Sequence, residues 1–350
     1  MTGSALALQE ALDVHRRSVD TDFFDLSLRE LARMAEEGEI RIAPEFQRQF
    51  RWNDDLQSAL IESFLLGLPV PPIFVATNLD GTWEVVDGLQ RICTVLRYLG
   101  IDAQESEDLK FADRPLRLQA LSTLEVFNAT GFIDLPRPVR LMFERRYLRV
   151  QVLSDKSDLD VRFELFRRLN VGAVALTPQE IRGCVYRGPF NTMVADLSRD
   201  KNFRDTVKLQ QQNQSNATFE EIVLKFFAYL NSADAYDGKV TQFLNSYMGE
   251  RAADTDLADD RELFTKVVAH LAKVTDGKPF LRSRTNITPV NQLEAVLVGI
   301  GRVLRSGAEP VTPRPGWQDD PALVQASTKG TNTRTTFHAR LDRAEQIFQP

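Results

Sequence analysis

In the stretch Trp83–Leu99, WEVVDGLQRICTVLRYL, a strand pattern is followed directly by a helix pattern. An apolar run typical of a strand ends at Asp87-Gly88, and a helical pattern follows with Gln90 and Arg91 in its first turn. A strand, a sharp loop and a helix in succession present backbone N–H groups to a ligand, as phosphate-binding loops do. Those unpaired groups already make a helix N-terminus positive and disfavour an arginine there. The pattern therefore predicts an anion beside Arg91, either the Asp87 carboxylate acting as N-cap or a bound phosphate.

The composition limits the kinds of site that this chain can carry. It has 350 residues and a formal net charge of −6, so it is not a polycation that coats nucleic acid. Any binding of phosphate would therefore depend on a few basic residues gathered at one site. Cys93 and Cys184 are far apart and near no histidine, which argues against a disulfide scaffold or a zinc site. No apolar segment has the length of a signal or a membrane span. We therefore expect a cytoplasmic protein with no membrane partner.

The patterning divides the chain into two domains. Strand and helix patterns alternate in the first half, which predicts an α/β or α+β domain over 22–190. Nearly all later signals are helical and predict a mostly α-helical domain over 191–350. Two helix starts are expected there: a capping box that opens at Thr218, and the N-cap-proline pair Thr288-Pro289. Glu309–Pro321 is expected to be a linker.

Local signals place three elements in the first half. Leu26–Glu37 has the spacing of an amphipathic helix. Ile73–Ala76 and Trp83–Val86 predict a hairpin around Asp80-Gly81, a dipeptide favoured in such turns. Asn53 is expected to cap a helix. The apolar residues at helical spacing in that helix are Leu56, Leu60, Phe64 and Leu65.

Several arginines are expected at junctions where an element begins or ends, and junctions commonly carry ligand sites. They are Arg48, Arg91, Arg168 and Arg182, the last in a helix that a capping box at Thr177-Pro178-Gln179-Glu180 starts. Simpler interpretations stay open. Asp87 and Gln90 also have the spacing of a capping box, and an arginine such as Arg91 is commonly a salt-bridge partner.

Four blocks carry a resemblance to a known family. They are PEFQRQFRW at 44–52, IESFLLGLPVPPIFV at 61–75, VVDGLQRICTVLRYL at 85–99 and FRRLNVGAVALTPQEIR at 166–182. As an ordered set they resemble the domain of unknown function that forms the N-terminal half of the GmrSD modification-dependent restriction enzymes, in the ParB/sulfiredoxin-like superfamily. The family pattern D-G-Q-Q-R has Leu89 in place of its first glutamine here, and R-L-N-x-G-G has Ala173 in place of its last glycine.

The resemblance implies a nucleotide-binding, often nucleotide-hydrolysing, component of a phage-defence or modification-dependent restriction system that acts on DNA. The His-Asn-His nuclease domain of those enzymes is not expected here, because the second half has only His270 and His338, without the spacing of such a site. A nuclease would then be a partner chain. The alternatives are a non-catalytic DNA- or nucleotide-binding module and, third, a metal-dependent nuclease.

The matched residues receive roles from the resemblance and from the needs of phosphoanhydride cleavage. Asp87 is the expected metal ligand or base, with Mg²⁺ as the candidate metal; Arg91 is expected to clamp phosphate oxygens and Gln90 to orient water. These three are the catalytic candidates. The residues expected to bind an NTP of unknown base or its phosphates are Gln47, Arg48, Gly88, Arg168, Asn170, Gly172, Gln179 and Arg182.

Overall fold

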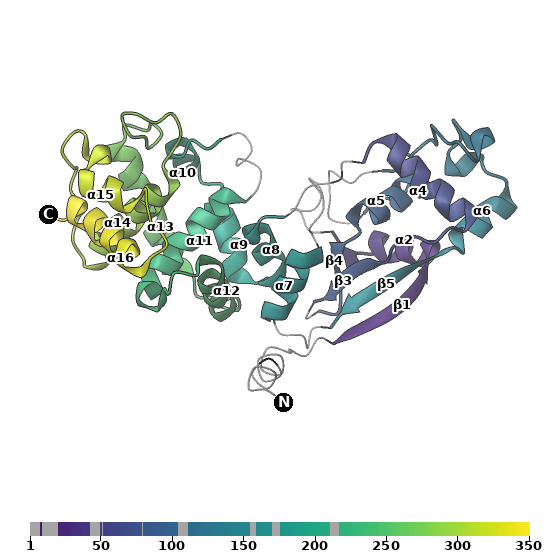
Figure 1. Ribbon diagram of the computed structural model, residues 1–350, viewed down its shortest axis with the longest axis horizontal. Helices are drawn as coiled ribbons and strands as arrows, with labels where there is room; N and C mark the ends of the chain where they lie inside the picture. The colour runs from purple at the N-terminus through teal and green to yellow at the C-terminus, as the bar shows by residue number, and fades with distance from the viewer. Residues whose placement is uncertain are drawn as a thin grey trace. The chain divides into compact units, whose positions relative to one another are not determined.

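The computed structural model describes residue 8 and residues 20–42, 50, 52–78, 80–103, 111–154, 159–169, 176–210 and 217–350. The chain divides into two compact units, Met1–Ala175 and Leu176–Pro350 (Figure 1). The sequence patterns placed the corresponding boundary at 190/191. Each unit is described by itself below.

The described part of the first unit is built on a five-stranded mixed sheet of order β1-β5-β3-β4-β2. The strands are β1 (Thr21–Ser27), β2 (Ile40–Arg41), β3 (Ile73–Thr77), β4 (Trp83–Asp87) and β5 (Tyr147–Leu153). β1 pairs with β5 and β3 with β4 in antiparallel fashion, whereas β3–β5 and β2–β4 are parallel pairs. The predicted α/β class of this unit is confirmed.

The β3–β4 hairpin confirms the predicted turn at Asp80-Gly81. Gly81 has φ +83°, a left-handed conformation that glycine adopts without steric cost. The Asp80 carboxylate accepts a hydrogen bond from the Thr82 amide at 3.1 Å. Because β2 runs parallel to β4, both strands end at the same edge of the sheet, and Asp87 is the last residue of β4 there.

Helices of the first unit pack on this sheet and on one another. They are α2 (Leu28–Glu36), α4 (Asp54–Leu66), α5 (Leu89–Leu99), α6 (Arg137–Glu144) and α7 (Leu159–Leu169), with short 3-10 turns η2 (Glu125–Phe127) and η3 (Phe132–Asp134). α5 follows β4 directly and contacts α2 and α4, while α7 contacts β4 (Figure 1). The strand–loop–helix expected at 83–99 is confirmed as β4–α5.

Two local predictions in this unit need correction. The helix predicted over Leu26–Glu37 begins at Leu28, because 21–27 forms β1 by pairing with β5, which lies more than a hundred residues later. In α4, Asn53 is the N-cap as expected, but Leu56 is 53% exposed and Gln57 is buried. The Gln57 amide can be buried because it has hydrogen-bond partners, which apolar spacing does not show.

The second unit is helical throughout its described residues, as predicted, with no strand among them. Its helices are α8 (Pro178–Val185), α9 (Pro189–Leu197), α10 (Lys201–Thr206), α11 (Thr218–Ser232), α12 (Val240–Arg251), α13 (Ala258–Val274), α14 (Val290–Arg305), α15 (Pro321–Ala326) and α16 (Arg334–Phe348), with 3-10 turns η5 (Ala233–Ala235) and η6 (Trp317–Asp319). α14 lies at the centre, in contact with α11, α13 and α16. None of the described helices combines the length and apolar character needed to cross a membrane.

The capping signals of this unit were only partly right. The capping box at Thr177–Glu180 is present. Thr218 is instead the first residue of α11, and Pro289 rather than Thr288 precedes α14, because the Thr288 hydroxyl accepts a hydrogen bond from the Lys208 amide. The predicted linker is packed into the unit, since the ring of Trp317 lies 5.4 Å from that of Phe280 and 5.2 Å from that of Phe348.

Candidate nucleotide site at the β4–α5 junction

The turn between β4 and α5 requires glycine at position 88. Gly88 has φ +101° and is the N-cap of α5. A Cβ atom at this position would lie 2.3 Å from Cγ2 of Ile73 and 3.1 Å from Nη2 of Arg91. The backbone conformation and the close packing both exclude a larger residue at position 88. Only glycine lets the β4–α5 turn lie this close to Ile73 at the start of β3.

Asp87 pairs with Arg91 and does not cap the helix. Oδ2 of Asp87 accepts a hydrogen bond from Nη2 of Arg91 at 2.7 Å, and the same nitrogen donates to the carbonyl of Pro72 at 3.1 Å. The N-cap residue of α5, Gly88, has no side chain with which to cap the helix. The capping-box interpretation of Asp87 and Gln90 is therefore wrong, because Gly88 takes the N-cap position and the Asp87 carboxylate reaches one turn forward to Arg91.

This arrangement leaves polar groups of the junction available to a ligand. Among the described residues, none hydrogen-bonds to Nη1 of Arg91 or to Oδ1 of Asp87. Nε of Arg91 is buried, so it is not one of the groups offered to a ligand. The Arg91 side chain is 16% exposed and that of Asp87 36% exposed. The first turn of α5 contains no acidic residue. A guanidinium and a helix N-terminus that begins at a glycine N-cap together favour an anion.

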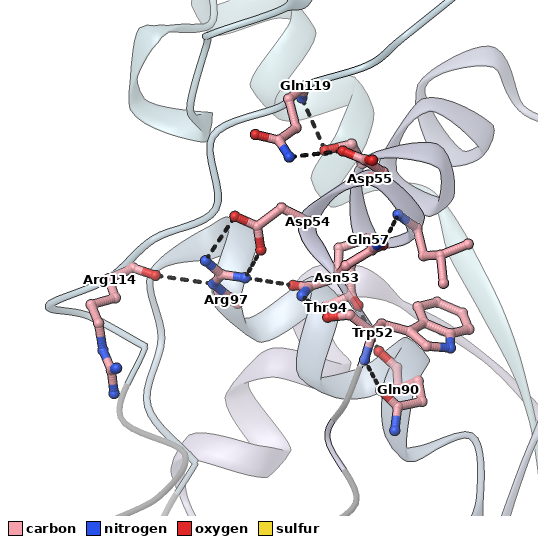
Figure 2. Close-up of polar contacts among 12 residues, drawn as sticks. Trp52, Asn53, Asp54, Asp55, Gln57, Gln90, Thr94, Arg97, Arg114 and Gln119 are labelled. Carbon is pink, nitrogen blue, oxygen red and sulfur yellow. Dashed lines mark hydrogen bonds and ion pairs between the residues drawn. The ribbon is translucent and has the colours of Figure 1, made fainter.

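Gln90 holds the end of the PEFQRQFRW block against α5. Its Oε1 accepts a hydrogen bond from the Trp52 amide at 3.1 Å, and the Trp52 carbonyl accepts one from Nε2 of Gln57 at 2.7 Å (Figure 2). The Gln90 carbonyl in turn accepts a hydrogen bond from the Thr94 hydroxyl at 2.7 Å. The first helical turn after the candidate site therefore fixes the backbone of a residue from another motif block.

A second set of contacts extends this network along α4 and α5. Nη1 of Arg97 donates to Oε1 of Gln57 at 3.1 Å and pairs with Oδ1 of Asp54 at 2.6 Å, while its Nε donates to the Arg114 carbonyl (Figure 2). Gln119 donates to Oδ1 of Asp55 at 2.7 Å. The sequence analysis missed these positioning residues. One signal in the sequence could have indicated them: Gln57 and Ser58 are adjacent polar residues in a helix whose other buried residues are apolar.

The other predicted site residues of the first unit have different surroundings. Gln47, Arg48, Asn170 and Gly172 lie outside the described residues. Arg168 is on α7 with its side chain 73% exposed, and its Nε donates to Oε1 of Glu164 at 2.7 Å. Hydrogen bonds from Arg167 and Arg168 lower the pKa of Glu164 to about 2.

Gln179 and Arg182 lie on α8, in the second unit, and contact each other. Arg182 is buried, with Nε bonded to Oε1 of Gln179 at 2.8 Å, Nη2 to Oε2 of Glu221 at 2.9 Å and Nη1 to Oδ1 of Asn245 at 3.4 Å. Burial lowers the pKa of Arg182, and the Glu221 carboxylate opposes that change. All three guanidinium nitrogens thus have partners within the helical unit, which gives Arg182 a packing role.

The described residues contain no group of three or more histidines, cysteines, aspartates or glutamates placed to hold a metal ion. Asp87 is the carboxylate at the β4–α5 junction. A single carboxylate fits the way Mg²⁺ is commonly bound in nucleotide sites, where substrate phosphates and water supply the remaining ligands.

The comparisons with known proteins agree with the motif blocks. Residues 28–187 match the family model of the GmrSD restriction endonuclease N-terminal domain. This stretch of the chain therefore carries a domain of the GmrSD N-terminal family, which confirms the resemblance to that family; the ParB/sulfiredoxin-like superfamily stays a prediction. No curated protein and no solved structure matched the chain.

Proposed function

We propose that the first unit binds a nucleoside triphosphate at the β4–α5 junction and hydrolyses it, as part of a restriction or phage-defence system that acts on DNA. The observation that carries this proposal is the position of Arg91. Asp87 and the Pro72 carbonyl hold its Nη2, while Nη1 donates to none of the described residues, beside a helix start whose N-cap residue is a glycine. The GmrSD family match supports the biological setting.

The chemistry needed for hydrolysis fits these groups. A phosphoanhydride is cleaved chiefly by positioning and by cations and N–H groups that stabilise charge on the phosphate oxygens. Arg91 supplies a planar cation that can donate to such an oxygen, and the first-turn amides of α5 supply further donors. Asp87 keeps one carboxylate oxygen for a proton of the attacking water or for Mg²⁺. When bound, Mg²⁺ would neutralise part of the phosphate charge.

In addition to orienting water, Gln90 positions the end of the PEFQRQFRW block. It anchors the Trp52 amide, four residues after Arg48 in the chain. Gln47 and Arg48, which lie outside the described residues, are proposed as further phosphate ligands from their place in the same motif block. Orientation of water by Gln90 remains a prediction, because the contact with Trp52 explains its presence equally well.

Action on DNA is proposed from the family, with a nuclease supplied by a partner chain. The alternative is a module that binds nucleotide or DNA without turnover, since one fold can serve either purpose. Nucleotide turnover distinguishes the two functions.

The test is phosphate release by the purified full-length chain with each of the four NTPs, with and without magnesium. We expect magnesium-dependent release with at least one NTP and its loss in Asp87→Asn. Asp196→Asn, which removes an exposed carboxylate paired with Arg261 in the second unit, is the control and should keep full activity. Saturable nucleotide binding without phosphate release would support the non-catalytic module. No binding of any NTP would overturn the proposed site.

A further inference from the structure

The first strand of the sheet has an open edge. β1 is the terminal strand in the order β1-β5-β3-β4-β2, and its seven residues pair with β5 without a register shift. In Figure 1 it runs along the outside of the sheet beside β5. An uninterrupted edge strand exposes a row of backbone donors and acceptors and is a template for pairing with another strand.

The hydrogen-bond pattern shows which residues of β1 point outward. The Leu28 amide donates to the Arg146 carbonyl at 2.8 Å, and the Ser154 amide donates to the Asp20 carbonyl at 2.9 Å. Hydrogen-bonded pairs alternate with non-bonded pairs in an antiparallel ladder, so the even-numbered residues of β1 bond to β5. The N–H and C=O groups of the odd-numbered residues face away from the sheet. They are Thr21, Phe23, Asp25 and Ser27.

β1 lacks several of the features that commonly protect an edge. The strand TDFFDLS contains no proline, no lysine and no bulge, and its charged residues are Asp22 and Asp25. Phe23 is 62% exposed and Phe24 is 41% exposed. The Asp25 carboxylate is already paired with Arg149, whose Nε and Nη2 lie 2.9 Å and 3.0 Å from its oxygens. Within the described residues, no strand covers this edge.

We propose that β1 pairs with β1 of a second copy of this chain, antiparallel and with a two-fold axis at Phe24. In this register Thr21 lies opposite Ser27 of the second copy and Phe23 opposite Asp25, so all four outward residues of each strand join the ladder. The two five-stranded sheets would then form one continuous sheet. The self-complementary contact is isologous and closes as a dimer.

Charge disfavours one neighbouring register, and the length of β1 disfavours the other. With the axis at Phe24, Asp22 faces Leu26 and no acid faces an acid. A shift of the axis to Asp25 places Asp25 opposite Asp25, which is unfavourable, and a shift to Phe23 places Ser27 opposite position 19, before the first residue of β1. In the register with the axis at Phe24, β1 pairs with itself along its whole length without a like-charge contact. A second copy is for this reason the proposed occupant.

Disulfide trapping tests the register in the full-length chain. Phe24→Cys places two cysteines opposite each other in a non-hydrogen-bonded pair, whose Cα separation of about 4.5 Å suits a disulfide. Phe23→Cys, the matched control, would face Asp25 of the second copy and should cross-link far less. Cys93 and Cys184 are buried and should not compete. Equal cross-linking of both variants, or none, would overturn the register.

Sedimentation over a range of concentrations tests the dimer itself. We expect a monomer–dimer equilibrium in the unmodified chain and, in Phe23→Pro, a dissociation constant raised about tenfold or more, because the outward amide at 23 is lost from both strands. The substitution spares the β1–β5 hydrogen bonds, so circular dichroism should be unchanged. Phe23→Thr keeps the amide and should dimerise. A protein that is monomeric throughout, or a Phe23→Pro variant that dimerises normally, would contradict the proposal.

Discussion

The Oε1 atom of Gln90 accepts a hydrogen bond from the backbone amide of Trp52 at 3.1 Å, and the two residues are 38 positions apart in the chain. The contact joins the D-G-L-Q-R block to the end of the PEFQRQFRW block. Gln90→Met removes the acceptor, and we expect it to lower the free energy of unfolding by about 1 kcal/mol. It should also weaken nucleotide binding, because Trp52 would no longer be held. Gln90→Glu keeps an acceptor and should restore stability in urea denaturation; equal losses in both variants would contradict a positioning role.

Arg91→Ala separates a phosphate ligand from a simple ion-pair partner of Asp87. Loss of a charged hydrogen bond to phosphate should weaken nucleotide binding by about 1.5 to 3 kcal/mol, measured by calorimetric titration. The melting temperature should change little, since the pair with Asp87 is partly exposed. Arg91→Lys should recover only part of the nucleotide affinity, because lysine lacks the planar guanidinium group with its paired donors. Reduced stability with unchanged nucleotide affinity would show that Arg91 serves only the fold.

Gly88→Ala should be much more destabilising than Gly81→Ala, although both glycines have positive φ. A Cβ at Gly81 would meet nothing within 4 Å, so only backbone strain of about 1 kcal/mol is expected. At Gly88 the contact with Ile73 adds about 1 to 3 kcal/mol. Chemical denaturation of the two variants measures the difference. Ile73→Ala combined with Gly88→Ala should recover part of the steric cost, and additive losses would contradict the close approach.

Lys225 is the central cation of a buried network in the second unit. Its Nζ lies 2.9 Å from Oε1 of Glu221 and 3.0 Å from Oε1 of Glu294. Burial lowers the pKa of Lys225, but the two carboxylates outweigh burial and raise it. Lys225→Met should cost about 3 to 5 kcal/mol, because it removes the cation that Glu221 and the buried Glu294 share and leaves them, among the described residues, only Arg182 and Arg340. Lys201, in an exposed i,i+4 pair with Asp205, is the matched control, and Lys201→Met should have no measurable effect on urea denaturation.

His270 should make stability depend on pH near neutrality. Burial lowers its pKa in the folded protein, opposed by the hydrogen bond from Nε2 to the Val311 carbonyl at 3.2 Å. The unfolded chain therefore binds a proton more readily, and this contribution to stability is lost as the pH falls through the unfolded pKa of about 6.5. We expect the unfolding free energy to rise between pH 5 and pH 8 and the rise to be smaller in His270→Gln. An identical pH dependence in both proteins would exclude His270 as its source.

Part of this protein could be predicted from the sequence because the signals are local. The strand, turn and helix at 83–99, the hairpin turn at Asp80-Gly81, the Asn53 N-cap and the capping box at Thr177 each depend on residues within one or two turns of one another. The class of each unit follows from such patterns. The motif blocks also sufficed to identify the family, since their order and composition can be read without coordinates.

Tertiary structure decided the contacts that link distant parts of the chain. The segment 21–27 is a strand because it pairs with β5. Leu56 is exposed, whereas Gln57 is buried with hydrogen bonds to Trp52 and Arg97. Arg91 donates a hydrogen bond to the carbonyl of Pro72, which directly precedes β3. Local patterns cannot report such choices, because a polar side chain is buried only where a distant partner satisfies it and a strand forms only where another strand completes its ladder.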